Sequence, residues 1–164
     1  YEPGDADTLW ELKRGFELGL GEGTGDEAKS ETYREKLDAE YRRAYLEWVG
    51  QCIDEEPRAV QVAEREGEPQ VDDGDQVVGY VFVLPASLAY IWDAAVLNEI
   101  YVQPEYRGTG VADELMEDAL AVARGQDLPL DRMVLDVDRA NERAQAFYER
   151  YGFEHWGEMV AREL

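Results

Sequence analysis

The alternation of apolar and polar residues predicts helices in the first third of the chain. Between residues 5 and 20, large apolar side chains recur at close to helical spacing, which predicts a helix there. The glycine-rich stretch 19–25 interrupts this pattern and predicts a mobile loop. A second helix is predicted from Asp26 to Ile53, where one apolar stripe includes Tyr41 and Trp48.

After residue 58 the period changes from helical to extended. The segment 59–64 alternates and the segment 77–84 is almost entirely apolar, which predicts a hairpin. The polar connection 67–75 contains the turn signal Asp73-Gly74. The elements predicted beyond it are a strand at 95–102, a helix at 110–124, a strand at 133–137, a helix at 142–151 between an Asn141 cap and Gly152, and an extended segment at 153–164.

This element order predicts an α+β fold, a mixed sheet with helices on both faces. The chain has 164 residues and neither an internal repeat nor a composition shift typical of a linker. That length buries one sizeable core. We therefore expect a single domain over residues 1–164.

The net charge of the chain limits the kinds of molecule that it is expected to bind. The chain has 38 acidic and 16 basic residues, so its net charge is -22, which disfavours nucleic-acid and anionic membrane partners. No apolar run reaches the roughly 18 to 20 residues of a membrane span. Cys52 is the only cysteine, which fits a reducing cytoplasm. We interpret the acidity as adaptation to concentrated salt, and an acidic protein from an ordinary cytosol is the alternative.

The glycines of residues 107–112 form the first candidate site. The run Arg107-Gly108-Thr109-Gly110-Val111-Ala112 lies where a predicted strand leads into a helix. Small residues let backbone N–H groups approach an anion, and a helix N-terminus carries partial positive charge. A dinucleotide-binding fingerprint needs Gly or Ala at position 113, where this chain has Asp. A pyrophosphate cradle and a plain tight turn both remain open at this point.

A second motif follows about 30 residues later and changes the picture. It reads Asn141-x-x-Ala144-x-x-Phe147-Tyr148-x-x-x-Gly152-Phe153. Together with Arg107-x-x-Gly110-x-Ala112, it makes residues 97–153 resemble the Gcn5-related N-acetyltransferases (GNAT). The composition makes the chain similar to a salt-adapted, halophilic member.

The resemblance implies acetyl-coenzyme A as donor and a primary amine, on a small molecule or a peptide, as acceptor. It implies a three-layer α/β/α arrangement around a mostly antiparallel mixed sheet, whose central strands, 95–102 and 133–137, splay apart around the pantetheine arm. The N–H groups of Tyr101 and Val102 would face the acetyl carbonyl, and Arg107 to Ala112 would hold the pyrophosphate. Asn141 and Phe147 would belong to the cofactor side. The family's first strand would precede Tyr1, so we expect it to be truncated here.

Two residues are candidates for the chemistry. The acceptor amine must lose a proton before attack, and Glu99, in an otherwise apolar strand, is the candidate base. Its alternative is an exposed or arginine-paired carboxylate. Tyr148 matches the family position of the acid that protonates the departing thiolate, and its alternative is a core tyrosine.

Other readings stay open on sequence alone. A non-catalytic acyl-coenzyme A sensor and an interaction domain without ligand are the rivals of an enzyme. His155 is the only histidine, so no metal site is predicted. The segments 24–38 and 90–92 are candidates for the acceptor wall. The acceptor itself stays open, as does the oligomeric state, for which a homodimer is one arrangement.

Overall fold

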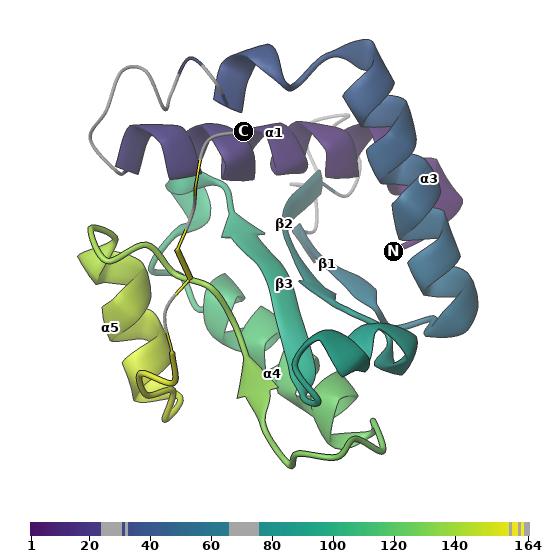
Figure 1. Ribbon diagram of the computed structural model, residues 1–164. Helices are drawn as coiled ribbons and strands as arrows, with labels where there is room; N and C mark the ends of the chain where they lie inside the picture. Colours follow the sequence, from purple (N-terminus) through teal and green to yellow (C-terminus); the bar gives the residue numbers. More distant parts are fainter. Residues whose placement is uncertain (24–30, 32, 66–75, 158, 161, 163–164) are drawn as a thin grey trace.

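The computed structural model describes residues 1–23, 31, 33–65, 76–157, 159–160 and 162. In this part of the chain a four-stranded sheet has the order β1-β2-β3-β4 (Figure 1). The strands are β1 (Val60–Arg65), β2 (Gln76–Val83), β3 (Ala95–Val102) and β4 (Met133–Val134). The first three are antiparallel, and β3 pairs with β4 in parallel. The predicted α+β fold with a mixed sheet is confirmed.

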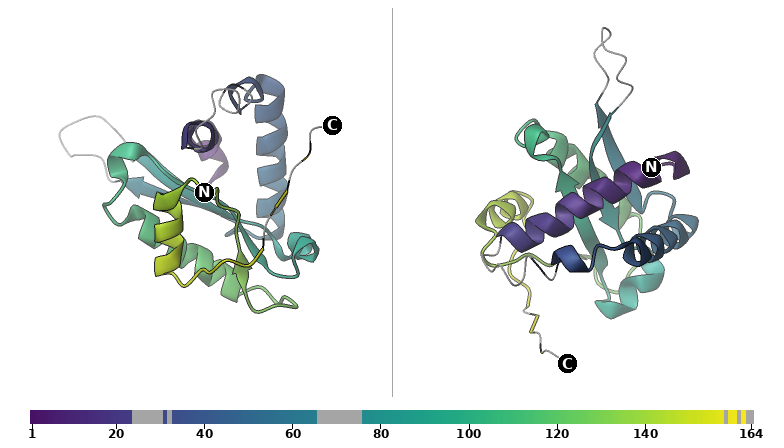
Figure 2. Two further views of the ribbon diagram at one scale, coloured as in Figure 1. Left: turned by 60° about the vertical axis from the view of Figure 1, so that its left-hand side comes forward. Right: turned by 90° about the horizontal axis from the view of Figure 1, so that it is seen from above.

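Helices cover both faces of this sheet. They are α1 (Ala6–Gly23), α3 (Ala39–Glu55), α4 (Val111–Arg124) and α5 (Glu142–Arg150), with 3-10 turns η1 (Pro3–Asp5), η2 (Ala86–Ile91) and η3 (Pro104–Tyr106). Figure 2 shows α1 and α3 on one face and α4 with α5 on the other. The molecule is therefore a three-layer α/β/α arrangement.

Strand β2 explains why the sheet needs both helical layers. Tyr80 and Phe82 are fully buried in the cluster formed with α1 and α3. Val81 and Val83 are fully buried in the cluster formed with α4. Successive side chains of a strand point to opposite faces, so a strand buried on both faces reads as the continuous apolar run seen in the sequence.

Two helical boundaries differ from the sequence prediction. Helix α1 continues through Gly19 to Gly23, because each glycine lowers helix stability by only about 1 kcal/mol and does not forbid the helix. The predicted second helix is interrupted: α3 begins at Ala39, and the Asp38 carboxylate accepts a hydrogen bond of 2.8 Å from the Tyr41 N–H. A local cap there competes with continuation of the helix.

The other boundaries were predicted with mixed success. Strand β3 has the predicted bounds, and Asn141 caps α5 through the Ala144 N–H at 3.1 Å. Strand β4 is shorter than predicted because β3 diverges from it after two paired residues. The segment expected to be extended after residue 152 forms no strand among its described residues. The turn at 73–74 lies outside the described residues.

A close contact brings α1 against the carboxyl end of β3. A Cβ atom added to Gly15 would lie 2.5 Å from the hydroxyl of Tyr101. Real Cβ atoms do not approach so closely, so only glycine allows the Tyr101 ring to lie against this turn of α1. The contact joins α1 to the carboxyl end of β3.

We predict that Asp38→Ala lowers the free energy of unfolding by about 1 kcal/mol, because the first turn of α3 loses its side-chain cap. Urea denaturation measures the change. Asp38→Asn is the matched control, since asparagine caps as well as aspartate and should cost a few tenths of a kcal/mol. Equal stability of all three proteins would contradict the capping role.

Candidate active site

The central strands part after a short paired stretch. Ala95 and Val96 pair with Met133 and Val134, and pairing between β3 and β4 stops there in the described chain. We call the place where they diverge the fork (Figure 1). Strand β3 also carries a bulge beside it, since Phe82 and Val83 of β2 face Glu99 and Leu97. Bulges re-aim backbone and side chains and are common next to active sites.

The register decides which backbone N–H groups face the fork. Gln103 N–H donates to the Val78 carbonyl of β2 at 3.0 Å. Antiparallel strands alternate in direction, so the N–H of Tyr101 also faces β2, where it is paired with Tyr80. The N–H groups of Ile100 and Val102 therefore point away from β2. This corrects the sequence prediction, which placed the Tyr101 N–H at the acetyl carbonyl.

The loop between η3 and α4 has the features of an anion cradle. Gly108 and Gly110 have φ angles of 79° and 98°, which favour glycine. In the described chain, the N–H groups of residues 108–110 have no backbone acceptor. The first N–H groups of α4 likewise lack partners within the helix. Added Cβ atoms on both glycines would meet nothing within 4 Å, so this face of the loop has room for a ligand.

Asp113, an acidic residue in the first turn of α4, is turned away from that loop. Its Oδ1 accepts hydrogen bonds from Arg150 at 2.9 Å and from the Tyr151 hydroxyl at 2.8 Å. Both partners belong to the end of α5. The carboxylate is therefore partly neutralised and also fastens α5 to α4.

Two arginines come together beside the cradle. Arg107 Nε donates to the Val102 carbonyl at 3.0 Å, and its guanidinium lies 5.6 Å from the centre of the Tyr101 ring. Partial desolvation, followed by the positive charge of Arg107, lowers the pKa of Arg143. Sequence reasoning missed Arg143, which is on α5. Two guanidinium groups from different elements create a local positive field in an acidic protein.

Tyr148 packs on the buried side of α5. Its ring lies 5.5 Å from that of Phe147 and 5.7 Å from that of Phe153, within the cluster around α4. Burial raises the pKa of Tyr148 to about 12, so the hydroxyl is protonated at neutral pH. In the described chain this hydroxyl has no hydrogen-bond partner, so it remains able to donate one.

Glu99 lies on the opposite face of β3, and its carboxylate is surrounded by donors. The residue is 5% exposed. Oε1 receives Lys13 Nζ at 2.6 Å and Asn98 Nδ2 at 3.1 Å. Oε2 receives the hydroxyls of Tyr80 at 2.6 Å and Tyr45 at 2.9 Å. Glu99 is thus neither exposed nor paired with an arginine, the alternative considered from sequence.

The same lysine joins Glu99 to a second buried carboxylate. Lys13 Nζ is 2.6 Å from Glu17 Oε1, and Lys36 Nζ is 2.6 Å from Glu17 Oε2. Burial alone would lower the pKa of Lys13, but the charges of Glu99 and Glu17 raise it overall. Burial would raise the pKa of Glu17, but Lys13 and then Lys36 lower it. Positive and negative charges alternate along Lys36, Glu17, Lys13 and Glu99, so the group is neutral as a whole.

Sequence reasoning missed Lys13 and Glu17, although a signal was present. Leu9, Lys13 and Glu17 are spaced by four residues, which places the two charges on the apolar stripe of α1. Charged residues on a buried stripe are almost always paired. The partner Glu99 could not be identified, because it is distant in sequence.

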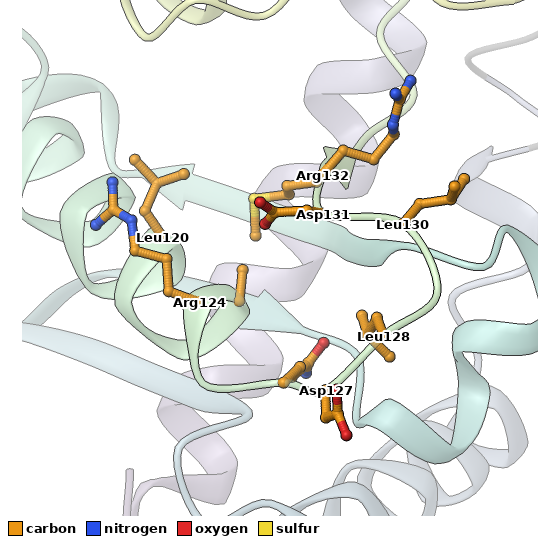
Figure 3. Close-up of a pocket in the computed structure, with 10 residues that line it drawn as sticks. Leu120, Arg124, Asp127, Leu128, Leu130, Asp131 and Arg132 are labelled. Atoms are coloured by element: carbon orange, nitrogen blue, oxygen red, sulfur yellow. The ribbon is translucent and has the colours of Figure 1, made fainter.

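The acceptor-wall segment predicted at 24–38 is described only at residues 31 and 33–38, which lie before α3, while residues 24–30 and 32 lie outside the described part. Tyr90, Ile91 and Trp92 are exposed, in η2 and just after it. They precede β3, so they lie at the opposite end of this strand from Val102. A hollow lies near the same end, between the end of α4 and β4 (Figure 3). Its lining includes Arg124, and none of the site residues predicted from sequence.

The described residues contain no cluster of His, Cys, Asp and Glu side chains arranged to bind a metal ion. Among the helices described, none combines the length and apolar character needed to cross a membrane.

Fork, bulge and glycine cradle together define an acyltransferase-type α+β fold. The chain matches the acetyltransferase (GNAT) family over residues 24–153, which is well over half of its length, and it belongs to this family. The resemblance drawn from the two motifs is confirmed, and the chain is an enzyme of the acetyl-coenzyme A-dependent acyltransferase class.

Named relatives agree with this assignment. The chain is 28% identical over 128 residues to the peptidyl-lysine N-acetyltransferase YjaB of Escherichia coli, covering 78% of this chain and 70% of that protein. It is 32% identical to an uncharacterized N-acetyltransferase of Archaeoglobus fulgidus, covering 72% and 76%. A match to an uncharacterized N-acetyltransferase of Mycobacterium bovis is 41% identical but covers only 40% of this chain and 41% of that protein.

Solved structures show the same fold. The ribosomal-protein-alanine N-acetyltransferase of Brucella melitensis superposes with a TM-score of 0.68 at 21% identity, covering 96% of this chain and 83% of that one. The PaiA N-acetyltransferase of Thermoplasma acidophilum, solved in complex with coenzyme A, has a TM-score of 0.63 at 20% identity, covering 92% and 84%.

We predict that Lys13→Met lowers the free energy of unfolding by about 3 to 5 kcal/mol, because it leaves Glu99 and Glu17 short of their shared cation. Arg14→Met is the matched control on the same helix. Arg14 pairs with Glu11 on the exposed side, so its loss should cost less than about 1 kcal/mol. Chemical denaturation of both variants measures the difference, and similar losses in the two would refute a special role for Lys13.

Proposed function

We propose that this protein transfers the acetyl group of acetyl-coenzyme A directly to a primary amine within a ternary complex. The observation that carries the proposal is the fork beside a bulge and a cradle of unpartnered N–H groups, on one side of β3. The proposal takes residues 1–164 as one acetyltransferase domain and places the reaction in the cytoplasm.

The cofactor fits the residues present. N–H groups of residues 108–112, at the N-terminus of α4, would hold the pyrophosphate, since such ends bind anions. Arg107 and Arg143 would add positive charge, while Asn141 fixes the start of α5 and Phe147 supports Tyr148. Acetyl-coenzyme A supplies the activated acyl group, and the protein orients it.

Backbone amides would stabilise the charge that develops on the acetyl oxygen. The N–H groups of Val102 and Ile100 point away from β2, toward the fork. A fixed N–H donor of this kind typically contributes about 10²- to 10³-fold in rate. The Arg107 contact with the Val102 carbonyl would hold the next peptide unit, between Val102 and Gln103.

Roles in the reaction are assigned to two residues. The amine proton would pass to Glu99 through an intervening water. The hydroxyl of Tyr80 or Tyr45, which donates to Glu99 Oε2, would then rotate so that the new proton on the carboxyl group has room. Tyr148 would donate to the thiolate that leaves. Because its pKa of about 12 exceeds that of a thiol, near 8.5, the hydroxyl would keep its proton and donate a hydrogen bond to the sulfur as the C–S bond breaks. The thiolate would leave as the anion and take its proton from water.

Direct transfer is favoured over an acetyl-cysteine intermediate. Cys52 is buried on α3, and burial followed by the charge of Glu55 raises its pKa to about 11. The thiolate is the nucleophilic form. At neutral pH this cysteine would therefore react poorly.

We also propose that the enzyme works in concentrated salt, on the basis of its net charge of -22. Acetyl-coenzyme A should bind saturably in calorimetry, and at about 1 M potassium chloride at least as tightly as at about 0.1 M, because salt screens the surface repulsion.

Gly110→Ala should weaken acetyl-coenzyme A binding about tenfold by straining the cradle, whereas Gly4→Ala serves as the control. Absence of binding by the folded protein would refute the proposed function.

Tyr148→Phe should lower kcat by about 10²- to 10⁴-fold while leaving acetyl-coenzyme A affinity nearly unchanged, because only the donor to the leaving thiolate is lost. Thiol release in the presence of a panel of amines measures kcat. Tyr90→Phe, at a residue 83% exposed, is the control. Undiminished turnover of the Tyr148 variant would remove this residue from the mechanism.

A further inference from the structure

The ammonium of Lys36 rests in a seat built from one carboxylate and two aromatic rings. Its Nζ lies 2.6 Å from Glu17 Oε2, 4.3 Å from the centre of the Tyr33 ring and 5.5 Å from that of Tyr41. We call Glu17, Tyr33 and Tyr41 the ammonium seat. Aromatic faces within about 6 Å of a cation attract it, so the seat has the chemistry of an alkylammonium site.

The carboxylate of the seat is buried and aimed at this position. The Glu17 side chain is 4% exposed. Its Oε1 is taken by Lys13 at 2.6 Å and by the Tyr41 hydroxyl at 3.4 Å. Its Oε2 has no hydrogen bond of good geometry in the described chain and faces only the Lys36 ammonium. Glu17 thus needs a second cation.

Lys36 supplies that cation from a more accessible position. Its side chain is 35% exposed, and it lies in the turn between helical residues 33–35 and the Asp38 cap of α3. The other members of the charged group are buried. A cation from solution could therefore replace the Lys36 ammonium without opening the core.

The seat is directly linked to the proposed base. Lys13 Nζ lies 2.6 Å from both Glu17 Oε1 and Glu99 Oε1, so one ammonium separates the two carboxylates. A molecule with two amino groups could present one amine on the Glu99 side while its other ammonium occupies the seat.

We propose that the seat binds the second, non-reacting ammonium of a linear diamine acceptor, and that Lys36 occupies the seat until the diamine displaces it. This proposal rests on the proposed function, because it names the acceptor class of the same site. A tethered lysine competes at an effective concentration of about millimolar. Its removal should therefore increase the apparent affinity for an external ammonium.

Tetramethylammonium chloride is the first probe, because it cannot be acetylated and reports on the seat alone. Calorimetry at one fixed potassium chloride concentration compares the unaltered protein, Lys36→Met and Arg43→Met. Arg43→Met removes the same charge, but the ion pair of Arg43 among the described residues is with the exposed Glu47, at 4.0 Å. Binding should be about tenfold tighter in Lys36→Met than in the other two. Equal binding in all three proteins, or none, would overturn the proposal.

Acetyl transfer to 1,4-diaminobutane and to 1-aminobutane is the second measurement. Lys36→Met should raise the ratio of diamine to monoamine kcat/KM about tenfold, and Glu17→Gln should lower it. A melting curve shows whether Glu17→Gln is folded. If it is not, the ratio of diamine to monoamine kcat/KM in Lys36→Met alone tests the proposal. Transfer to both amines with one ratio in every variant would refute the seat and leave the proposed function standing. Tetramethylammonium binding without transfer to any amine would support the seat and refute the function.

Discussion

The Lys13 ammonium, held between two buried carboxylates, is the contact on which the position of the proposed base Glu99 depends. It lies 2.6 Å from both Glu17 and Glu99, so a single charge fixes α1 against β3. Removing one partner of a buried ion pair strands the other in a low-dielectric interior, which is why such pairs resist rearrangement. Gly15 also lets the Tyr101 ring lie against the next turn of α1. The position of Glu99 thus depends on two features of α1, the ion pair of Lys13 and the packing of Gly15 against Tyr101.

A different constraint orders the edge of β3 that faces β4. In the part of the chain that the structure describes, β4 pairs with β3 only at Ala95 and Val96, so the backbone groups of β3 beyond the fork need other hydrogen-bond partners. One of these backbone groups, the Val102 carbonyl, accepts a hydrogen bond from Arg107. Asp113 joins α4 to α5, so the helix that carries Tyr148 is fixed relative to the cradle. In the proposed reaction, acetyl-coenzyme A and the amine would therefore approach β3 from two different sides. The Asp113 contacts stabilise the first side and the Lys13 ion pairs stabilise the second.

Local patterns in the sequence were sufficient for most of the fold. The period change after residue 58, the bounds of β3 and the Asn141 cap each depend on neighbouring residues, and each was predicted. The break at Asp38 was not, because an apolar stripe continues across it and only the cap competes. The direction of the Tyr101 N–H depends on a bulge opposite β2, and the Lys13 pairing spans 86 residues. Such long-range geometry has no local signature in a single sequence.

The distribution of charge explains how so acidic a protein could hold its site in salt. The chain has three lysines against thirteen arginines, and Lys13 and Lys36 both serve the neutral group with Glu17 and Glu99. Surface charges are screened when the Debye length falls to about 3 Å at 1 M, whereas buried pairs are screened much less. Concentrated salt would therefore weaken the repulsion of the surface and leave the interior pairs intact. Lysine also differs from arginine in being a compact ammonium, so Lys36 resembles the alkylammonium that we propose displaces it.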